Sequence, residues 1–413
     1  MPEPFTYAHE YDAIVIGSGL GGLTAGALLA RAGKRVLVLE KNTRIGGAAT
    51  TYDRHGRIFE VSLHETANPE IGPGPASEVF RALDLGDEIT FVPTGAFQEI
   101  RSPMIGAPLA LPSGLDALET TLRERFPSDA DNISAFLRQI ARSQDALRFF
   151  SERHDGQWWL GHAVDLPLDL WALIRDMRSS LSDVLERYFG RNEALKLALA
   201  GNLPYYADDP RTLWWLAYAI AQGAFFSGGG WYIRGGSSAL TERLAGIIRE
   251  AGGGVRIDAP VIRVLTTEEG RVRGVDYDIA GPGVTTATAP VVIANAAPHA
   301  VCGMLPETLR AGFMEPYADR PLSLSLFEIQ FGLTRPGRDL GITSYSTVLL
   351  PEWMESLADY AAAGEVLGSF PNDRLPPVIV VDYGQIDSGL DTGAGAPVSV
   401  TGVDRLENWA TLS

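Results

Sequence analysis

One segment near the N-terminus constrains the fold of this chain more than any other. An apolar run over residues 12–16 is followed at once by the turn GSGLGG (17–22). Small and apolar residues then continue to Gly33, a residue type typical of helix C-termini, and a second apolar run ends on Glu40. Strand, glycine turn, helix and strand within such a short stretch predict a Rossmann-type βαβ unit, and hence an α/β fold.

The glycines of this turn each have a physical role in binding a dinucleotide. Gly17 allows the tight turn, Gly19 lets the backbone approach a pyrophosphate, and Gly22 lets the helix pack closely on the strand. The helix N-terminus offers N–H groups to the phosphates, and Glu40 is expected to accept hydrogen bonds from ribose hydroxyls. We therefore predict a site for the ADP half of a dinucleotide. It consists of Gly17, Ser18, Gly19, Leu20, Gly21, Gly22, Glu40 and Lys41.

A second glycine pair favours FAD over NAD as the ligand. Gly46 and Gly47 follow soon after Glu40, where NAD needs no further glycines but the longer diphosphate of FAD can use additional backbone N–H groups. The alternative is a plain turn. With their neighbours Arg44 and Ala48, these two glycines complete the predicted cofactor contacts of the N-terminal segment. The carboxylate of Glu40 disfavours NADP, since it would repel a 2′-phosphate.

Composition narrows the other possible functions. The net charge of −17 disfavours nucleic acid and anionic lipid as partners, because phosphate binding needs clustered Lys and Arg. The single cysteine, Cys302, excludes an internal disulfide. The six histidines form no HExxH pattern and no GxSxG motif occurs, so neither a metal site nor hydrolase chemistry is expected.

The N-terminus shows no signal-peptide pattern, so the chain is expected to be cytoplasmic. The most apolar run, residues 213–226, is too short to span a bilayer. A weak peripheral contact with a membrane stays open, because the exposed half of this run could enter the lipid headgroup region. The same residues would equally suit a buried helix.

Past the first unit the pattern becomes mostly helical and then turns to strands. Helices are predicted over 117–127, 132–150 and 241–253, and a hairpin turn at Glu269-Gly270. Residues 290–298 suggest another buried strand, and 321–400 alternate in the manner of an antiparallel sheet with one covered face. The aromatic stretch 157–226 suits a helical core and a tunnel for an apolar substrate equally well.

Several blocks together resemble one known family. These are VIGSGLGGLTAGALLARAGKRVLVLEKNTRIGGAATTY from residue 15, YIRGGSSAL from residue 232, AGGGVRIDAPVIRV from residue 251, and VVIANAAP from residue 291. Their order and spacing resemble the phytoene desaturase, carotenoid isomerase and retinol saturase group of FAD-dependent oxidoreductases, from residue 10 to about 330. Beyond that the likeness is looser.

The resemblance implies a Rossmann-like FAD-binding domain built from separated segments, with an α+β substrate domain and a helical cap. The expected boundaries are 1–75 for the first FAD segment, 76–226 for the cap and substrate region, 227–310 for the second FAD segment, and 311–413 for the antiparallel sheet. The family usually extends about a hundred residues further and carries its last flavin-side motif there. A fragment, a short natural form, a partner chain or a homo-oligomer completing the flavin site would each be consistent with this sequence.

The resemblance also implies individual roles. Val261 would contact the adenine through its backbone, although an ordinary core valine is the alternative. Residues 59–64 would run toward the isoalloxazine ring, which places Ser62, Leu63 and His64 on the flavin or substrate side. The glycine pair Gly235-Gly236 would lie there as well.

Two of these residues carry open alternatives, and two positions depart from the family. His64 is the candidate catalytic residue, in proton transfer or substrate orientation, but it can equally be a hydrogen-bonded histidine without a catalytic part. Arg234 either faces the flavin or caps a turn. Ala48 stands where many relatives have Arg, and Ala297 where many have Asp.

Three functions are consistent with these patterns. The first is an FAD-dependent oxidoreductase that desaturates, saturates or isomerises an extended apolar polyene or isoprenoid. The second is an amine-oxidase-like flavoenzyme with a small polar substrate. The third is a non-catalytic or incomplete flavoprotein subunit that works in a complex.

Overall fold

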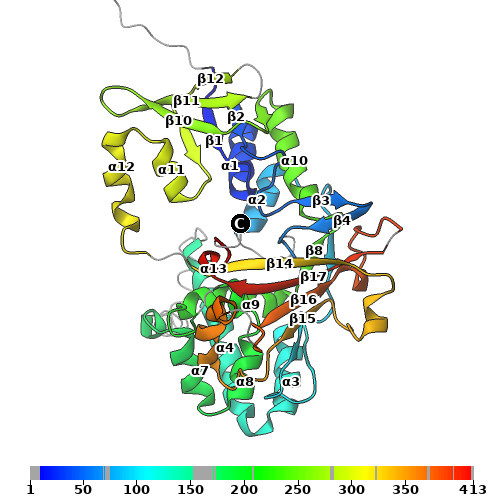
Figure 1. Ribbon diagram of the computed structural model, residues 1–413. Helices are drawn as coiled ribbons and strands as arrows, with labels where there is room; N and C mark the ends of the chain where they lie inside the picture. The colour runs from blue at the N-terminus through cyan, green and yellow to red at the C-terminus, as the bar shows by residue number, and fades with distance from the viewer. Residues whose placement is uncertain are drawn as a thin grey trace, which may run out of the picture.

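The computed structural model describes residues 10–151 and 171–410, apart from short gaps at 68, 70–74, 172–173, 207–208, 280–282, 321–322, 370–372 and 394. Two parts are visible (Figure 1): a smaller upper part around the first strands, and a larger lower part in which helices lie against a sheet. The described portion of the aromatic stretch begins at Trp171, so Trp158 and Trp159 lie outside it.

A four-stranded parallel sheet forms the centre of the upper part. Its order is β13-β1-β2-β9, with β1 at Ala13–Ile16, β2 at Val36–Leu39, β9 at Gly254–Arg256 and β13 at Val292–Ala294. Helix α1 (Leu20–Arg31) connects β1 to β2, as predicted, and packs on α10 (Ser237–Glu250) and α2 (Pro75–Leu83). The α/β fold with a Rossmann-like domain is thereby confirmed.

The continuous apolar runs of β1 and β2 are explained by burial on both faces of this sheet. Val15 and Val38 point toward α1 and α10 and join one hydrophobic cluster. Ile14 and Leu37 point the other way and join a second cluster. Because successive strand residues face opposite sides, a strand covered on both sides has to be apolar throughout.

A three-stranded antiparallel sheet covers the second face. It contains β10 (Val261–Thr266), β11 (Val272–Ile279) and β12 (Gly283–Thr288). The predicted hairpin turn is confirmed, with Gly270 at φ +80°. Helices α11 (Pro298–Met304) and α12 (Glu307–Met314) follow β13 and lie beside this sheet.

A six-stranded sheet forms the centre of the lower part, in the order β14-β17-β16-β15-β6-β7. The strands are β14 (Ser325–Gly332), β17 (Pro397–Asp404), β16 (Val378–Asp382), β15 (Ser346–Leu349), β6 (Gln98–Arg101) and β7 (Leu109–Leu111). The strands predicted over residues 321–400 pair antiparallel with one another, as expected. The sheet also continues beyond them, because β15 pairs in parallel with β6 from the N-terminal half. The sheet was also expected to have one covered face and one solvent-exposed face. This does not hold for β17, whose residues are buried along almost its whole length.

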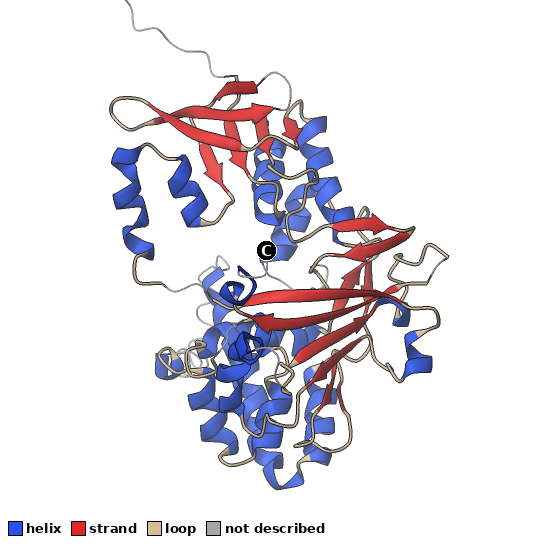
Figure 2. Cartoon of the chain, in the orientation of Figure 1, coloured by secondary structure: helices blue, strands red, loops and turns tan. Residues whose placement is uncertain are grey.

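Helices gather against this sheet (Figure 2). They are α3 (Leu115–Arg125), α4 (Ala130–Ser151), α7 (Leu181–Phe189), α8 (Glu193–Leu199) and α9 (Trp215–Gly228), with the short α13 (Leu406–Ala410) at the end of β17. Two strand pairs link the parts: β3 (Thr51–Arg54) with β4 (Arg57–Glu60), and β5 (Phe91–Pro93) with β8 (Trp231–Ile233).

The apolar run 213–226 folds mostly into α9, whose Trp215, Tyr218 and Phe226 are buried in the core. Trp214, just before the helix, is 47% exposed. Within the described ranges, no helix is both long enough and apolar enough to cross a membrane.

Candidate dinucleotide site and adjoining pocket

The turn after β1 can be built only from glycine at its main positions. Gly17 has φ +91°, and a Cβ added to it would lie 2.5 Å from the Asn295 carbonyl oxygen. A Cβ on Gly22 would lie 2.2 Å from the carbonyl oxygen of Gly17. Gly19 is the N-cap of α1, and no side chain of the described residues caps that helix. The first-turn N–H groups of α1 are therefore available to a phosphate.

The second glycine pair packs directly on this turn. The Gly46 N–H donates to the Ser18 carbonyl at 2.9 Å, and Gly19 and Gly46 form a parallel bridge. A Cβ on Gly47 would lie 3.2 Å from the Gly19 Cα, and Gly46 has φ +106°. Two turns far apart in the sequence therefore form one glycine surface at the carboxyl end of the parallel sheet.

Glu40 lies at the same edge with its carboxylate buried. Its Oε2 accepts hydrogen bonds from the Ser18 N–H at 2.9 Å and the Ser18 hydroxyl at 2.7 Å. Its Oε1 accepts from the Asn42 N–H at 2.9 Å. Since a carboxylate has about four acceptor positions, one remains for a ribose hydroxyl. Lys41, Arg44 and Ala48 are exposed nearby.

Val261 begins β10 close to Glu40. The Ala259 N–H donates to the Glu40 carbonyl at 2.8 Å, which fixes the chain just before Val261 beside β2. The side chain of Val261 is 9% exposed and belongs to the core cluster of Ile14 and Leu37. Its side chain is thus a core valine, and the backbone contact with adenine stays a prediction.

Asn295 is a residue of this site that the sequence analysis did not single out. It follows β13, the parallel neighbour of β1, and its side-chain Nδ2 lies 2.8 Å from the position of a Cβ on Gly19. The strand predicted over residues 290–298 forms, but β13 is only partly buried rather than buried, because it lies at the edge of the sheet. The place of Asn295 directly after this strand was the available signal, because ligands of parallel sheets bind at the carboxyl ends of the strands.

The mid-chain glycine pair forms the entry to α10. Gly235 and Gly236 both have φ +87°, and a Cβ on Gly236 would lie 2.3 Å from Thr51 Cγ2. The Thr51 N–H in turn donates to the Ser238 hydroxyl at 2.7 Å. This pair therefore brings the start of α10 against the segment that follows Gly46-Gly47. Arg234 lies instead at the surface, in an ion pair with Asp387 at 3.0 Å.

The segment after β4 leads to His64, which is 5% exposed. The Tyr383 hydroxyl lies 2.6 Å from Nδ1, the Thr401 hydroxyl lies 3.1 Å from Nε2, and a Glu328 carboxylate oxygen lies 3.6 Å from Nε2. Burial lowers the pKa of His64 to about 4, so the imidazole is neutral at neutral pH. Burial raises the pKa of Glu328 to about 7. The cluster makes His64 a hydrogen-bonded residue at the site, and its catalytic role stays a prediction.

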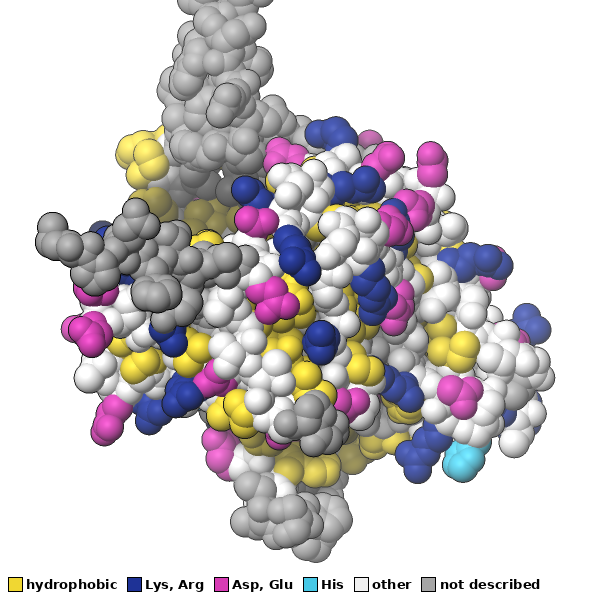
Figure 3. Space-filling view, turned by 90° about the horizontal axis from the view of Figure 1, so that it is seen from above, with side chains coloured by type: hydrophobic (Ala, Val, Ile, Leu, Met, Phe, Trp, Pro, Cys, Tyr) yellow, Lys and Arg dark blue, Asp and Glu magenta, His cyan; other side chains and the backbone are white. Residues whose placement is uncertain are grey.

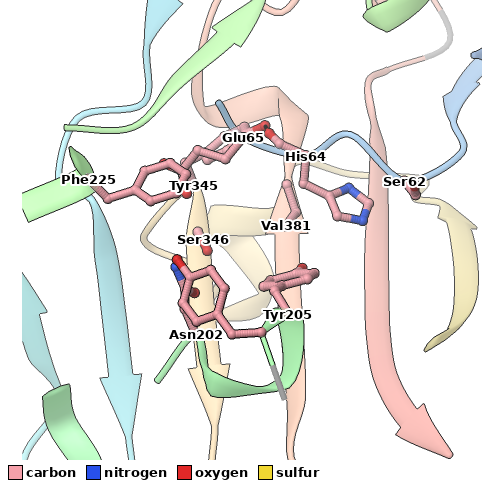
Figure 4. Close-up of a pocket in the computed structure, with 10 residues that line it drawn as sticks. Ser62, His64, Glu65, Asn202, Tyr205, Phe225, Tyr345, Ser346 and Val381 are labelled. Carbon is pink, nitrogen blue, oxygen red and sulfur yellow. Dashed lines mark hydrogen bonds between the residues drawn. The ribbon is translucent and has the colours of Figure 1, made fainter. Parts of the chain in front are cut away.

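A pocket of about 220 Å³ adjoins this cluster (Figure 4). Ser62, His64 and Glu65 supply one wall, and Asn202 and Tyr205 lie opposite. The remaining lining residues are Tyr206, Phe225, Tyr345, Ser346 and Val381. Leu63 instead packs against the core of the Rossmann part. The pocket thus combines four Tyr and Phe side chains with several polar groups, a mixture that suits a small-molecule site.

The surface above the Rossmann part shows Lys and Arg side chains interspersed with Asp and Glu (Figure 3). Among the described residues no group of three or more His, Cys, Asp or Glu side chains is arranged to hold a metal ion. The expectation that nucleic acid is not a partner stays a prediction.

Comparison with known proteins indicates the class of protein to which this fold belongs. Residues 15–82 match the family model described as an NAD(P)-binding Rossmann-like domain. An oxidoreductase from Methanosarcina mazei has the same fold, with a TM-score of 0.65 and 17% identity, over 97% of this chain and 81% of that one. The fold and the glycine turns thus define a Rossmann-type dinucleotide-binding protein.

Proteins related to this chain in sequence indicate a narrower class of enzymes. All-trans-retinol 13,14-reductase of Rattus norvegicus is 30% identical over 73% of this chain and 50% of its own length. Phytoene desaturase (neurosporene-forming) of Cereibacter sphaeroides is 26% identical over 67% of this chain and 51% of its own length. The chain is a homologue of these enzymes, which confirms the resemblance predicted from its motifs. It spans about half the length of the relatives it matches.

Proposed function

We propose that this chain binds FAD and works as an FAD-dependent oxidoreductase. The observation that carries the proposal is the hydrogen bond from Gly46 N–H to the Ser18 carbonyl, which joins the two glycine turns at the uncapped start of α1. A single glycine turn suits any dinucleotide, whereas the joined turns offer backbone along a longer diphosphate.

The proposed substrate is an extended apolar polyene or isoprenoid that is desaturated, saturated or isomerised. The names of the relatives, a retinol reductase and a phytoene desaturase, support this class. The aromatic wall of the pocket, which includes Phe225, Tyr345 and Tyr206, supports an apolar ligand at the end of the segment that runs from Glu60 to His64.

When bound, FAD would supply the hydride or electron-pair chemistry. The glycine turns and Asn295 would hold the diphosphate, and Glu40 the ribose. His64 is neutral, and the hydroxyls of Tyr383 and Thr401 engage its two ring nitrogens. It would therefore contribute a fixed ring face to the pocket wall, against which the substrate lies. The tyrosine and threonine hydroxyls keep the ring in one position, so the wall is preformed.

The test is whether purified protein is yellow, or takes up added FAD with a visible flavin absorbance band. Gly22→Ala should abolish FAD uptake, because its Cβ would lie 2.2 Å from the Gly17 carbonyl oxygen. Gly312→Ala in α12 is the matched control, since a Cβ there meets no atom within 4 Å. A folded, colourless protein that takes up no FAD would overturn the proposal and favour a non-catalytic subunit.

If the protein binds FAD, anaerobic mixing of the FAD-bound protein with candidate substrates distinguishes between polyenes and small amines. Bleaching of the flavin band by a polyene, or reoxidation of reduced flavin by one, supports the proposed reaction. Bleaching by small amines alone would contradict it and would support an amine-oxidase-like enzyme.

A further inference from the structure

Glu65 is a pocket residue that the functions considered so far do not use. It follows His64, and its neighbour Thr66 exchanges both backbone hydrogen bonds with Trp231, at 2.8 and 2.9 Å. A Cβ on Gly230 would lie 1.4 Å from Glu65 Oε1. The carboxyl group therefore occupies a position that only a glycine at residue 230 leaves open, on a loop fixed by strand-like pairing.

The hydrogen bonds around Glu65 favour a protonated carboxyl group. The Thr94 hydroxyl lies 2.8 Å from Glu65 Oε1 and 2.9 Å from the Gly230 carbonyl oxygen. One hydroxyl hydrogen cannot fully serve two acceptors. A proton on Oε1 resolves this, because the carboxyl group then donates to Thr94 and Thr94 donates to Gly230. Burial agrees with this arrangement, since it raises the pKa of Glu65 to about 8.

Glu65 lines the pocket, and its other carboxyl oxygen, Oε2, is the one that is not paired with Thr94. No described residue donates a hydrogen bond to it, and no lysine or arginine lines the pocket. Tyr206 and Tyr345 stay protonated, because burial raises the pKa of both phenols. The wall thus offers an uncharged acceptor among aromatic rings and no cation that could pair with an anionic ligand.

We propose that Glu65 determines specificity by accepting a hydrogen bond at Oε2 from the terminal hydroxyl of an isoprenoid or polyene alcohol. This rests on the proposed function and narrows its substrate from an apolar polyene to one with an uncharged hydroxyl end. The volume of about 220 Å³ suits such an end group rather than a whole polyene. A carboxylate end is excluded, because two acceptors would face each other without a cation.

The test measures binding rather than turnover. The purified full chain, supplied with FAD, is titrated with all-trans-retinol and with its deoxy hydrocarbon analogue, each followed by its own fluorescence. Wild type should bind the alcohol about tenfold more tightly, the value of one net hydrogen bond. Glu65→Gln should keep this preference, because the amide can donate to Thr94 and still present its oxygen. Glu65→Leu should lose the preference while binding the hydrocarbon as wild type does.

Glu124→Leu, on the exposed side of α3, is the matched control and should keep the full preference. Equal binding of alcohol and hydrocarbon by wild type would overturn the role of Glu65 and leave the proposed function intact. Failure to bind either ligand would contradict the polyene function itself. Preferential binding of retinylamine, lost in Glu65→Gln, would show an ionised carboxylate pairing with an ammonium group and would also overturn the proposal.

Discussion

The carboxylate of Glu60 accepts a hydrogen bond from the backbone N–H of Ser237 at 2.8 Å, so a residue of the β3–β4 hairpin caps helix α10 from 177 positions away. The Ser237 hydroxyl and the Tyr232 hydroxyl donate to the same carboxylate, at 2.5 and 2.9 Å. Glu60 is fully buried. One side chain therefore joins the hairpin, strand β8 and the N-terminus of α10.

Removing this carboxylate should destabilise the protein strongly. Glu60→Ala leaves three buried donors without a partner, and we expect the free energy of unfolding to fall by about 3 kcal/mol. Glu60→Gln should cost less, because its amide oxygen can still accept from the Ser237 N–H and the Tyr232 hydroxyl, while the Ser237 hydroxyl can accept from the amide NH2. Urea unfolding measures both. A Glu60→Ala protein as stable as wild type would show that the cap contributes nothing.

The second glycine turn, which packs on the first, should be sensitive to a single methyl group at Gly46. A Cβ on Gly46 would lie 2.3 Å from the Ala49 carbonyl oxygen, at a φ of +106° that L-residues avoid. Gly46→Ala should lower both the stability of the protein and its affinity for FAD. A strain of roughly 1.4 kcal/mol in the FAD-bound protein would weaken FAD binding about tenfold. Equilibrium dialysis with FAD gives the affinity. Unchanged affinity would separate this turn from the cofactor site.

Because of His64, the free energy of unfolding should depend on pH between about 6.5 and 4. Its pKa is lowered by burial from 6.5 to about 4, so below the unfolded value the unfolded chain binds a proton that the folded chain does not. Stability should therefore fall as the pH drops from about 6.5 toward 4. His64→Asn should flatten this part of the profile relative to wild type. Parallel profiles for the two proteins would show that His64 does not titrate in this way.

Two roles were predicted for Arg234, facing the flavin or capping a turn, and a substitution can test the first of them. Its guanidinium and the Asp387 carboxylate are 53% and 70% exposed. Such a surface pair contributes about 0.5 kcal/mol or less. Arg234→Ala should therefore leave stability and FAD affinity nearly unchanged. A marked loss of FAD affinity, measured by dialysis, would show instead that the side chain reaches the cofactor.

Elements with a local cause could be predicted from the amino-acid sequence. The apolar runs of β1 and β2 and the glycines that the turn at residues 17–22 requires follow from periodicity and backbone freedom within a few residues. The end of α1 at Arg31, shortly before Gly33 with its φ of +75°, has the same local cause. The sequence blocks that begin at residues 232, 251 and 291 likewise indicated the family. Their residues and their spacing can be compared with those of other proteins without knowledge of the fold. The structure confirms the local elements, and the sequence relatives support the resemblance.

The side chains that come together from distant parts of the chain became apparent from the folded arrangement. His64 meets Tyr383 from 319 positions away, and Glu65 meets Gly230 and the wall containing Tyr205. The parallel pairing of β15 with β6 joins the two halves of the chain in the same way. Periodicity shows which face of an element is buried but not which element covers it. A partner chosen by packing of several segments together therefore becomes visible only once the chain is folded.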